Sequence, residues 1–263
     1  MLLPRPGETE LHLWSTRLDG ELTPGDQAWL LNQLTHVELQ RLMRFQHPAA
    51  RDAFLRSHCL LQSVLTLYDG IPPTSRIFFT SSHGKPSIAP RCNPLGLNFN
   101  LSHSGRYALL LVGTATELIG VDIEQHKPDR PLRQLSERYF SARERAFIAD
   151  LDHQQRTLTS AFFSLWSLKE AFVKAHGRGI ALGLDRFSFD LAESTAVPGF
   201  STDLALDPPP ECWLFRRLEW FPHHSAALAS ARPIETISLH EMHFIAAAEK
   251  GATFLTHTTD YQH

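Results

Sequence analysis

The sequence predicts an α+β protein made of two similar halves. Two observations lead to this fold class. A strand, a group of helices and three further strands can be assigned over residues 12–112, and the same order recurs over residues 118–230. The segment between them, residues 113–117, contains no Gly/Ser-rich or Pro-rich linker, so we expect the two halves to pack tightly.

The first half is predicted to contain three helices. Thr23 and Pro24 have the residue types of an N-cap and a first helical position, and Thr35 with Glu38 forms a capping box. The third helix is predicted over residues 48–68, where apolar residues recur at helical spacing. The strands of this half are predicted at residues 12–14, 76–80, 97–101 and 107–112.

The second half repeats this order, with a further capping box at Ser141 and Glu144. Its helices are predicted at residues 132–139, 142–151 and 158–176, and its strands at residues 118–124, 186–191, 213–220 and 226–230. We therefore divide the chain into an N-terminal half, a C-terminal half and a C-terminal tail, at residues 1–115, 116–233 and 234–263.

Composition narrows the classes of function. Of 263 residues, 43% are hydrophobic and 20% are charged, which is typical of a soluble globular protein. The 25 Lys and Arg against 28 Asp and Glu give a net charge of -3, which excludes nucleic-acid binding by bulk positive charge. The cysteines, Cys59, Cys92 and Cys212, have no CxxC spacing, and neither a signal peptide nor a membrane-spanning stretch is present. A cytoplasmic protein is expected.

Residues 119–124 (Ile-Gly-Val-Asp-Ile-Glu) carry two acids on a predicted strand. Because side chains alternate along a strand, Gly120, Asp122 and Glu124 share one face and the three apolar residues share the other. Two carboxylates at this spacing repel each other unless a cation lies between them, and hard oxygen ligands suit Mg²⁺. An edge strand with solvated acids is the alternative interpretation.

Glu170 and Lys174 lie four residues apart on the predicted helix 158–176, where their side chains are neighbours. They form either a solvent-exposed ion pair of about 0.3–0.5 kcal/mol, or a third metal ligand with a phosphate contact. The alternatives stay open at this point, because a single Glu–Lys pair is common on helix surfaces.

Two loops and one helical region offer anion contacts. Residues 102–105 (Ser-His-Ser-Gly) are predicted to form a hydroxyl-rich turn that either cradles a phosphate or satisfies its own backbone. A nucleophilic serine is disfavoured because the GxSxG motif is absent. The turn Gly84-Lys85-Pro86 presents one lysine. Residues 41–56 contain four arginines (Arg41, Arg44, Arg51 and Arg56) and one acid (Asp52), a local charge of +3 that suits a small polyanion or a solvated helix face.

The order of these motifs resembles the Sfp-type 4′-phosphopantetheinyl transferases. The resemblance rests on His83-Gly84-Lys85-Pro86, on Phe99-Asn100-Leu101-Ser102-His103-Ser104, on Gly120-Val121-Asp122-Ile123-Glu124 and on the segment from Trp166 to Lys174, and it extends over residues 11–230. It implies a pseudo-dimer of two α+β halves with the active site in the cleft between them. It also implies transfer of the phosphopantetheine arm of coenzyme A to a serine of an apo acyl or peptidyl carrier protein, which releases adenosine 3′,5′-bisphosphate.

The resemblance also implies roles for residues of the second half. Asp122, Glu124 and Glu170 would hold Mg²⁺, or alternatively Mn²⁺, against the pyrophosphate of coenzyme A. Glu170 would accept the proton of the carrier serine, directly or through a metal-bound water. Lys174 would stabilise the leaving phosphate.

For coenzyme A, the resemblance implies contacts in the first half. Ser102, His103 and Ser104 would hold the phosphates and ribose, and Gly84, Lys85 and Pro86 would border the adenine and the 3′-phosphate. Related sequences carry RxRF/W-L where this chain has Arg51-Asp52-Ala53-Phe54-Leu55, so the 3′-phosphate is assigned to Arg51, with Arg41 as a second contact.

The expected partners are a carrier protein and coenzyme A, with neither nucleic acid nor a membrane. A monomer is expected because a pseudo-dimer completes its own cleft, and rim arginines Arg138, Arg143 or Arg145 would dock an acidic carrier. The sequence does not distinguish carriers of fatty-acid, polyketide or non-ribosomal peptide synthesis. The alternatives are a metal-dependent phosphodiesterase or nuclease that uses the same carboxylates, and a non-catalytic coenzyme A-binding relative.

Overall fold

The computed structural model describes residues 2–114, 118–151, 155–191, 197–244 and 253–257. The chain forms two compact units, one of residues 1–116 with 234–263 and one of residues 117–233. The C-terminal segment, expected as a separate tail, therefore belongs to the first unit. None of the described helices is long and apolar enough to cross a membrane.

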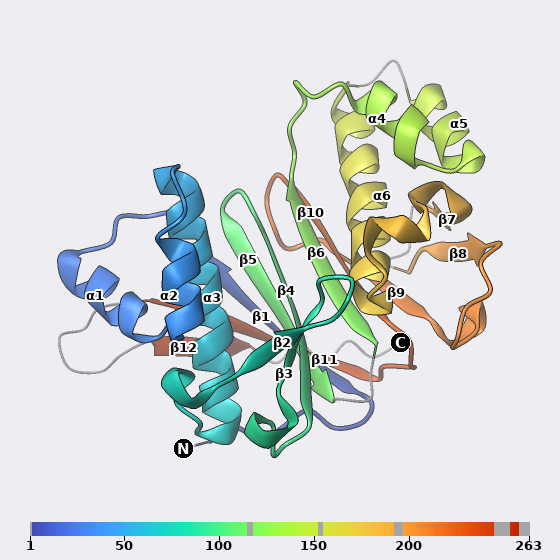
Figure 1. Ribbon diagram of the computed structural model, residues 1–263. Coiled ribbons are helices and arrows are strands. Elements are labelled where there is room, and N and C mark those ends of the chain that lie inside the picture. The colour runs from blue at the N-terminus through green and yellow to red at the C-terminus, as the bar shows by residue number, and fades with distance from the viewer. Residues whose placement is uncertain (1, 115–117, 152–154, 192–196, 245–252, 258–263) are drawn as a thin grey trace. The chain divides into compact units, whose positions relative to one another are not determined.

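The described residues of the first unit form three helices, a five-stranded sheet and the two-stranded hairpin β2–β3 (Figure 1). Its helices are α1 (Pro24–Asn32), α2 (His36–Leu42) and α3 (Pro48–Asp69). Its strands are β1 (Glu10–Arg17), β2 (Phe78–Thr80), β3 (Pro86–Ile88), β4 (Leu97–Ser104), β5 (Tyr107–Thr114), β11 (Thr236–His243) and β12 (Thr253–His257). The sheet has the order β12-β11-β1-β5-β4, in which β11 runs parallel to β1 and the other pairs are antiparallel.

In the part of the second unit that the structure describes, there are three helices, a three-stranded sheet and a hairpin. Its helices are α4 (Leu132–Tyr139), α5 (Ala142–Asp150) and α6 (Gln155–His176). Its strands are β6 (Ile119–Gln125), β7 (Phe187–Asp190), β8 (Gly199–Thr202), β9 (Leu214–Leu218) and β10 (His224–Ser230), with two short 3₁₀ turns, η3 (Gly179–Leu182) and η4 (Leu184–Arg186), between α6 and β7. The sheet has the order β6-β10-β9, and β7 pairs with β8.

The two units share one order of elements, which confirms that part of the prediction. Each begins with a strand, continues through three helices and a short hairpin, and ends its repeat with two strands. Each sheet then places the first strand beside the last of these two, as β1-β5-β4 and β6-β10-β9. The hairpin strands β3 and β8 and the C-terminal strands β11 and β12 were not predicted.

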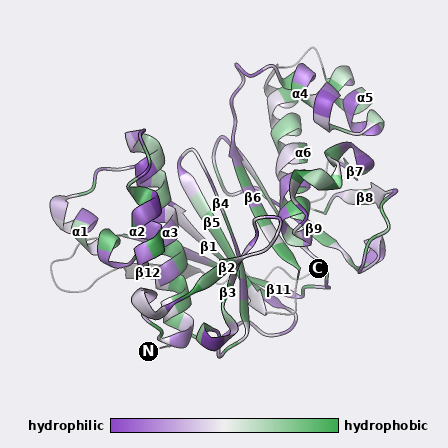
Figure 2. Ribbon diagram, in the orientation of Figure 1, coloured by the Kyte–Doolittle hydropathy of each residue, from purple (hydrophilic) through white to green (hydrophobic). Residues whose placement is uncertain are grey.

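The capping residues act locally as predicted. Thr35 with Glu38 and Ser141 with Glu144 form reciprocal capping boxes at the starts of α2 and α5. Helix α3 ends where Gly70 adopts a left-handed conformation at φ 69°. Along the helices hydrophobic and hydrophilic residues alternate (Figure 2), as expected where one face packs on a core and the other contacts solvent.

Candidate active site

Strand β6 carries the acidic motif in the predicted alternation. Ile119, Val121 and Ile123 are at most 1% exposed, so the apolar face of the strand is buried. Asp122, on the other face, is itself only 3% exposed. The alternative of solvated acids on an edge strand is therefore wrong for Asp122, since a carboxylate this deeply buried needs a partner.

Gly120 lets helix α6 approach β6 closely, and the two elements lie side by side in Figure 1. A Cβ atom at residue 120 would lie 2.1 Å from the carbonyl oxygen of Ala171 and 2.5 Å from the backbone nitrogen of Ala175. No side chain fits at these distances, so glycine is required for the contact. The close approach brings the C-terminal half of α6 against the strand that carries Asp122.

Lys174 makes its short contact across this interface. Its Nζ lies 2.6 Å from Oδ1 of Asp122 and 3.4 Å from the carbonyl oxygen of Val121. The sequence placed Lys174 beside Glu170 on the helix and did not predict the link to Asp122. The Asp122–Lys174 ion pair is buried on the aspartate side and half-buried on the lysine side, so solvent screens it less than a surface pair.

Glu170 lies within the electrostatic reach of both acids of β6. Burial, the main cause, and the charge of Asp122 raise the pKa of the Glu170 carboxyl to about 6, with Lys174 opposing the shift and Glu124 adding to it. Three carboxylates therefore interact around one ammonium group. Within the described ranges, however, no group of three His, Cys, Asp or Glu side chains is close enough to hold a metal ion.

A second buried ion pair, which the sequence analysis missed, lies on the same helix. Lys169 is 0% exposed, and its Nζ lies 2.7 Å from Oε2 of Glu144, the capping residue of α5. The only sequence indication was the capping box, which assigned Glu144 a local role at the start of its own helix.

In the first unit, Arg51 lies in the first turn of α3 and lines a pocket of about 230 Å³. The other lining residues are Gln27, Phe45, Gln46, Pro48, Asp52 and Leu55. The N-cap residue of this helix, His47, makes no side-chain capping hydrogen bond. The first helical turn and a guanidinium therefore border one cavity, which is an arrangement suited to an anion.

The other arginines of the basic region differ in environment. The guanidinium of Arg41 lies 5.2 Å from the ring centre of Phe54, a cation–π contact. Arg56 is buried and donates hydrogen bonds to Asp52 at 2.9 Å and to the carbonyl oxygen of Gly20 at 2.6 Å. Arg56 is thus a structural residue, so fewer of the four arginines in residues 41–56 are available to bind an anion than the sequence suggested.

Lys85 lies in the turn between β2 and β3. Ser81 Oγ accepts a hydrogen bond from the backbone nitrogen of Lys85 at 3.1 Å, and Gly84 adopts φ 90° beside it. Burial lowers the pKa of the Lys85 ammonium to about 8. Pro86 begins β3. The predicted turn is therefore present, with its lysine half-buried.

Ser102, His103 and Ser104 belong to β4, so the prediction that they form a turn was wrong. They pair with residues 107–109 of β5, and the turn follows at Gly105 and Arg106. Alternation along the strand directs His103, which is exposed, to the face opposite the two serines. Their extended conformation arises because the strand pairing continues up to the hairpin turn.

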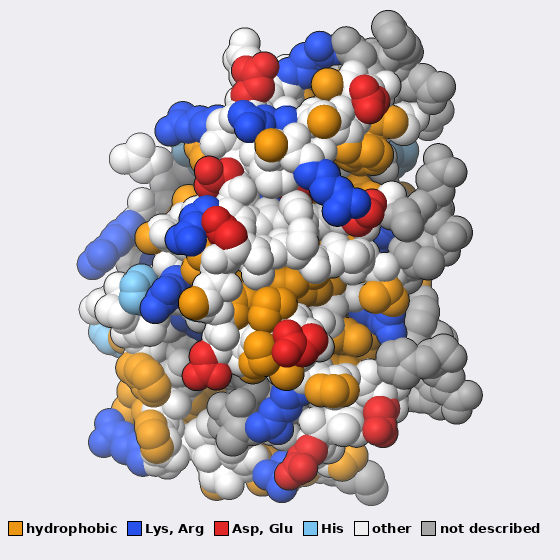
Figure 3. Space-filling model, turned by 90° about the vertical axis from the view of Figure 1, so that its right-hand side faces the viewer, with side chains coloured by type: hydrophobic (Ala, Val, Ile, Leu, Met, Phe, Trp, Pro, Cys, Tyr) orange, Lys and Arg blue, Asp and Glu red, His pale blue; other side chains and the backbone are white. Residues whose placement is uncertain are grey.

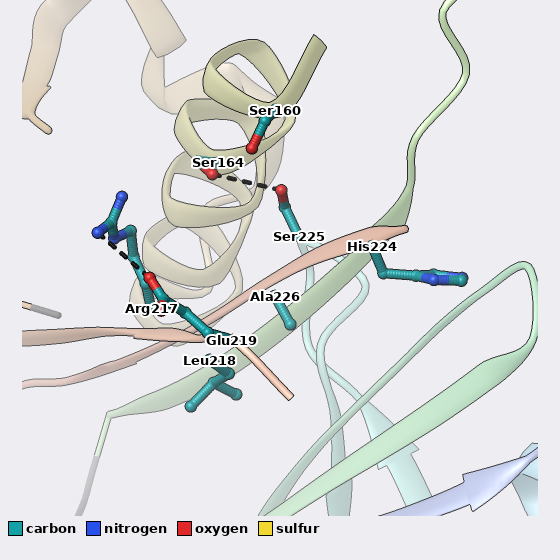
Figure 4. Close-up of a pocket in the computed structure, with 8 residues that line it drawn as sticks. All are labelled: Ser160, Ser164, Arg217, Leu218, Glu219, His224, Ser225 and Ala226. Atoms are coloured by element: carbon teal, nitrogen blue, oxygen red, sulfur yellow. Dashed lines mark hydrogen bonds and ion pairs between the residues drawn. The ribbon is translucent and has the colours of Figure 1, made fainter. Parts of the chain in front are cut away.

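A polar pocket of about 240 Å³ lies beside the acidic strand in the second unit (Figure 4). It is lined by Ser160, Ser164, Arg217, Leu218, Glu219, His224, Ser225 and Ala226. The hydroxyl groups of Ser164 and Ser225 lie 3.3 Å apart. Ser225 is opposite Glu124 in the β6–β10 register, so the pocket adjoins that one carboxylate of β6. No sequence pattern had indicated this pocket.

Two family models match the chain. Residues 118–230 match the 4′-phosphopantetheinyl transferase superfamily, and residues 21–115 match the model described as 4′-phosphopantetheinyl transferase, N-terminal. The segments with the carboxylates and with Arg41 and Arg51 therefore lie in separate matched regions.

Curated relatives cover most of the chain. The 4′-phosphopantetheinyl transferase HetI of Nostoc sp. is 38% identical over 185 residues, which are 68% of this chain and 76% of the relative. The 4′-phosphopantetheinyl transferase Sfp of Bacillus subtilis is 27% identical over a region that covers 85% of this chain and 93% of the relative. The L-aminoadipate-semialdehyde dehydrogenase-phosphopantetheinyl transferase of Xenopus laevis is 28% identical over a region that covers 80% of this chain and 73% of the relative. Together with the ordered motifs and the acidic β6–α6 interface, these matches establish that the chain belongs to the Sfp-type 4′-phosphopantetheinyl transferase family.

Proposed function

We propose that this protein transfers the 4′-phosphopantetheine arm of coenzyme A to a serine of an apo acyl or peptidyl carrier protein, using the β6–α6 interface as its catalytic centre. The supporting observation is the gathering of Asp122, Glu124, Glu170 and Lys174 at one interface of a family member. In the reaction, the serine oxygen bonds to the phosphorus that carries pantetheine, and the bond to the bridging oxygen breaks. Adenosine 3′,5′-bisphosphate leaves with that oxygen.

Glu170 is proposed as the group that accepts the serine proton. Its pKa of about 6 makes it a stronger base than an ordinary carboxylate, while it remains ionised at neutral pH. Burial, which is the main cause of this shift, also keeps water from competing for the carboxylate.

The donor set fits a hard divalent cation. Asp122, Glu124 and Glu170 offer only oxygen ligands, and the mutual repulsion that raises the pKa of Glu170 would be relieved by a positive ion. We propose these three residues as the ligands of Mg²⁺, with Mn²⁺ as the alternative. When bound, the ion would neutralise charge on the pyrophosphate.

Lys174 is proposed to neutralise the leaving phosphate. Its ammonium group is held at 2.6 Å by Asp122, so its position is fixed before substrate binds. A lysine ammonium serves as a point charge for phosphate oxygens without a strict orientation requirement.

Coenzyme A contacts in the first unit complete the proposal. The anion-suited pocket at Arg51 supports assignment of the 3′-phosphate to Arg51, with Arg41 as second contact. Lys85, with its pKa lowered by burial, would regain its full charge beside a phosphate. The contacts of Ser102, His103 and Ser104, the pseudo-dimer with its active-site cleft, the monomeric state and the cytoplasmic location remain part of this proposal.

The carrier is proposed to dock on exposed arginines of α4 and α5. Arg138, Arg143 and Arg145 are all exposed, and Arg143 already contacts Asp190 at 2.6 Å. On the face drawn in Figure 3, basic and acidic side chains are interspersed. Charge reversal at Arg138 and Arg145 is expected to raise the KM for the carrier with little change in the KM for coenzyme A.

The test is incubation of the purified protein with coenzyme A, Mg²⁺ and a panel of apo carriers, followed by intact mass spectrometry of each carrier. A gain of one phosphopantetheine group is expected, lost with EDTA and in Asp122→Ala and Glu170→Ala. Glu211→Gln, at an exposed acid outside the interface, serves as the matched control and retains activity. Transfer that persists in Glu170→Ala would refute the proposed base.

The alternative functions predict different ligands. A phosphodiesterase or nuclease would cleave an oligonucleotide with the same carboxylates. The family matches give no support to this alternative function. A non-catalytic relative would bind coenzyme A in calorimetry yet modify no carrier. The same protein preparation tests both.

A further inference from the structure

Lys169 uses its full hydrogen-bonding capacity inside the second unit. Its Nζ donates to Glu144 at 2.7 Å, to the carbonyl oxygen of Leu184 at 2.7 Å and to that of Phe187 at 2.7 Å. An ammonium group has three donors, and all three have short acceptors. The Nζ also lies 4.4 Å from the ring centre of Phe187. These contacts therefore hold the ammonium group of Lys169 in one position.

Glu144 is fixed in the same way from its own side. Its Oε2 accepts from the backbone nitrogen and the hydroxyl of Ser141, each at 2.9 Å, and its Oε1 accepts from the backbone nitrogen of Phe189 at 3.0 Å. The Lys169–Glu144 ion pair thus links α6 to the start of α5, to η4 and to β7.

The ion pair and the glycine contact hold α6 from nearly opposite sides. An α-helix turns by about 100° per residue, so Lys169 and Ala171 are about 200° apart around the axis. Ala171 faces Gly120 on β6, and Lys169 faces α5 and β7. Glu170 lies between them, about 100° from each, on the flank of the helix. Two contacts on nearly opposite sides of the helix therefore flank Glu170.

A buried ion pair contributes this geometry at a cost in stability. Burying an ammonium and a carboxylate is expensive, and an apolar pair of similar shape is often as stable or more so. An apolar contact tolerates sliding and rotation, whereas three hydrogen bonds to fixed acceptors do not. The Lys169–Glu144 ion pair therefore contributes a defined position of α6 rather than additional stability.

We infer that Lys169, held by Glu144, is a positioning residue that sets the rotation of α6 and so presents Glu170 and Lys174 to Asp122 on β6. This inference rests on the proposed function, in which Glu170 and Lys174 act on substrate. Lys169 itself, being 0% exposed, touches no substrate.

The test compares four forms of the full-length protein: wild type, Lys169→Met, the double variant Lys169→Met with Glu144→Gln, and Phe215→Leu. Methionine keeps the length of the lysine stem without its donors. The double variant removes the carboxylate charge that Lys169→Met would leave buried, so part of the lost melting temperature is expected to return. Phe215→Leu is the matched control, because it loosens the same core from strand β9.

The expected result separates position from stability. Per folded molecule, kcat falls at least tenfold in Lys169→Met and stays low in the double variant, while the KM for coenzyme A changes less than threefold. In Phe215→Leu, kcat per folded molecule stays near the wild-type value at a comparable loss of melting temperature. A kcat that returns together with melting temperature in the double variant would overturn the inference.

A second measurement does not depend on catalysis. Hydrogen exchange of the backbone amides of residues 170–174 is expected to accelerate in both Lys169 variants, with no change in β10. Unchanged exchange in a folded variant would also overturn the inference. If wild-type protein modifies no carrier, the proposed function fails, while the exchange result still decides whether Lys169 holds the helix.

Discussion

The first strand and the third helix of each unit are equivalent elements, and they bury different groups between them. In the first unit, β1 and the 22-residue α3 meet through Tyr68, whose hydroxyl lies 2.6 Å from Nδ1 of His12 and accepts from Nε1 of Trp14 at 3.0 Å. In the second unit, β6 and the 22-residue α6 meet through the Asp122–Lys174 ion pair. One contact joins aromatic side chains, and the other is ionic.

Under the proposed function, the ionic contact of the second unit serves the chemistry and the aromatic contact of the first unit serves stability. Burial lowers the pKa of His12, although Glu10 opposes the shift, so the aromatic contact favours a neutral ring. Neutral hydrogen bonds and ring packing stabilise by about 0.5–1.5 kcal/mol each. In the second unit, burial first and then repulsion from Asp122 raise the pKa of Glu170. Such repulsion destabilises the folded chain and is useful only if a substrate or cation relieves it.

The largest expected contrast comes from removing one group from each contact. Lys174→Met should lower kcat/KM for carrier modification by about 10²–10³-fold, because the charge proposed to neutralise the leaving phosphate is lost. Tyr68→Phe should leave kcat/KM within twofold. Steady-state kinetics with one carrier measures both, and a large loss of activity in Tyr68→Phe would contradict the division of roles between the units.

Gly120→Ala should be the most damaging conservative change in the second unit. The new Cβ would collide with Ala171 and Ala175, so α6 must move away from β6, at a cost of about 3 kcal/mol in unfolding free energy. Gly25→Ala in α1 is the control, since the nearest atom to a Cβ there is 3.7 Å away. Denaturant unfolding of the two variants checks this, and equal stabilities would contradict the close approach.

Tyr68→Phe should have a smaller effect, on stability alone. Loss of the hydroxyl removes the hydrogen-bond partner of both His12 and Trp14, which should cost about 1–2 kcal/mol. The melting temperature of the variant measures this loss. A melting temperature equal to that of the wild type would show that the aromatic contact of the first unit contributes little.

The smallest effects are those of pH, and they run in opposite directions in the two units. The folded-state pKa of Glu170, about 6, exceeds its ordinary 4.5, so its contribution to stability is complete below pH 4.5 and is lost as pH rises through 6. Burial lowers the pKa of His240 to about 4 from 6.5, so its contribution is present above pH 6.5 and is lost as pH falls towards 4.

Unfolding free energies of two variants across pH 4–8, measured in EDTA, check these signs. Glu170→Gln should stabilise the protein relative to the wild type above pH 6, by about 1 kcal/mol. His240→Leu should lessen the loss of stability below pH 6.5, because burial, and after it the charge of His12, disfavours protonation of the His240 ring. A Glu170→Gln variant less stable than the wild type at pH 8 would contradict the repulsion among the carboxylates.

The sequence determined the features that depend on neighbouring residues. The alternation of Gly120, Asp122 and Glu124, the capping boxes and the repeated order of elements could all be predicted, because side-chain direction and helix ends follow from local geometry. The motifs, taken in their order along the chain, also carried the resemblance to the family.

The tertiary structure decided which distant groups meet. Lys174 contacts Asp122, Lys169 lies inside the core against Glu144, and β11 joins the sheet beside β1. Strand β11 was not predicted, and no local pattern in residues 236–243 says that this segment will pair with β1. Sequence periodicity specifies which face of an element is buried. Which other element covers that face depends on packing across the whole chain. The same packing decides which distant group compensates a buried charge.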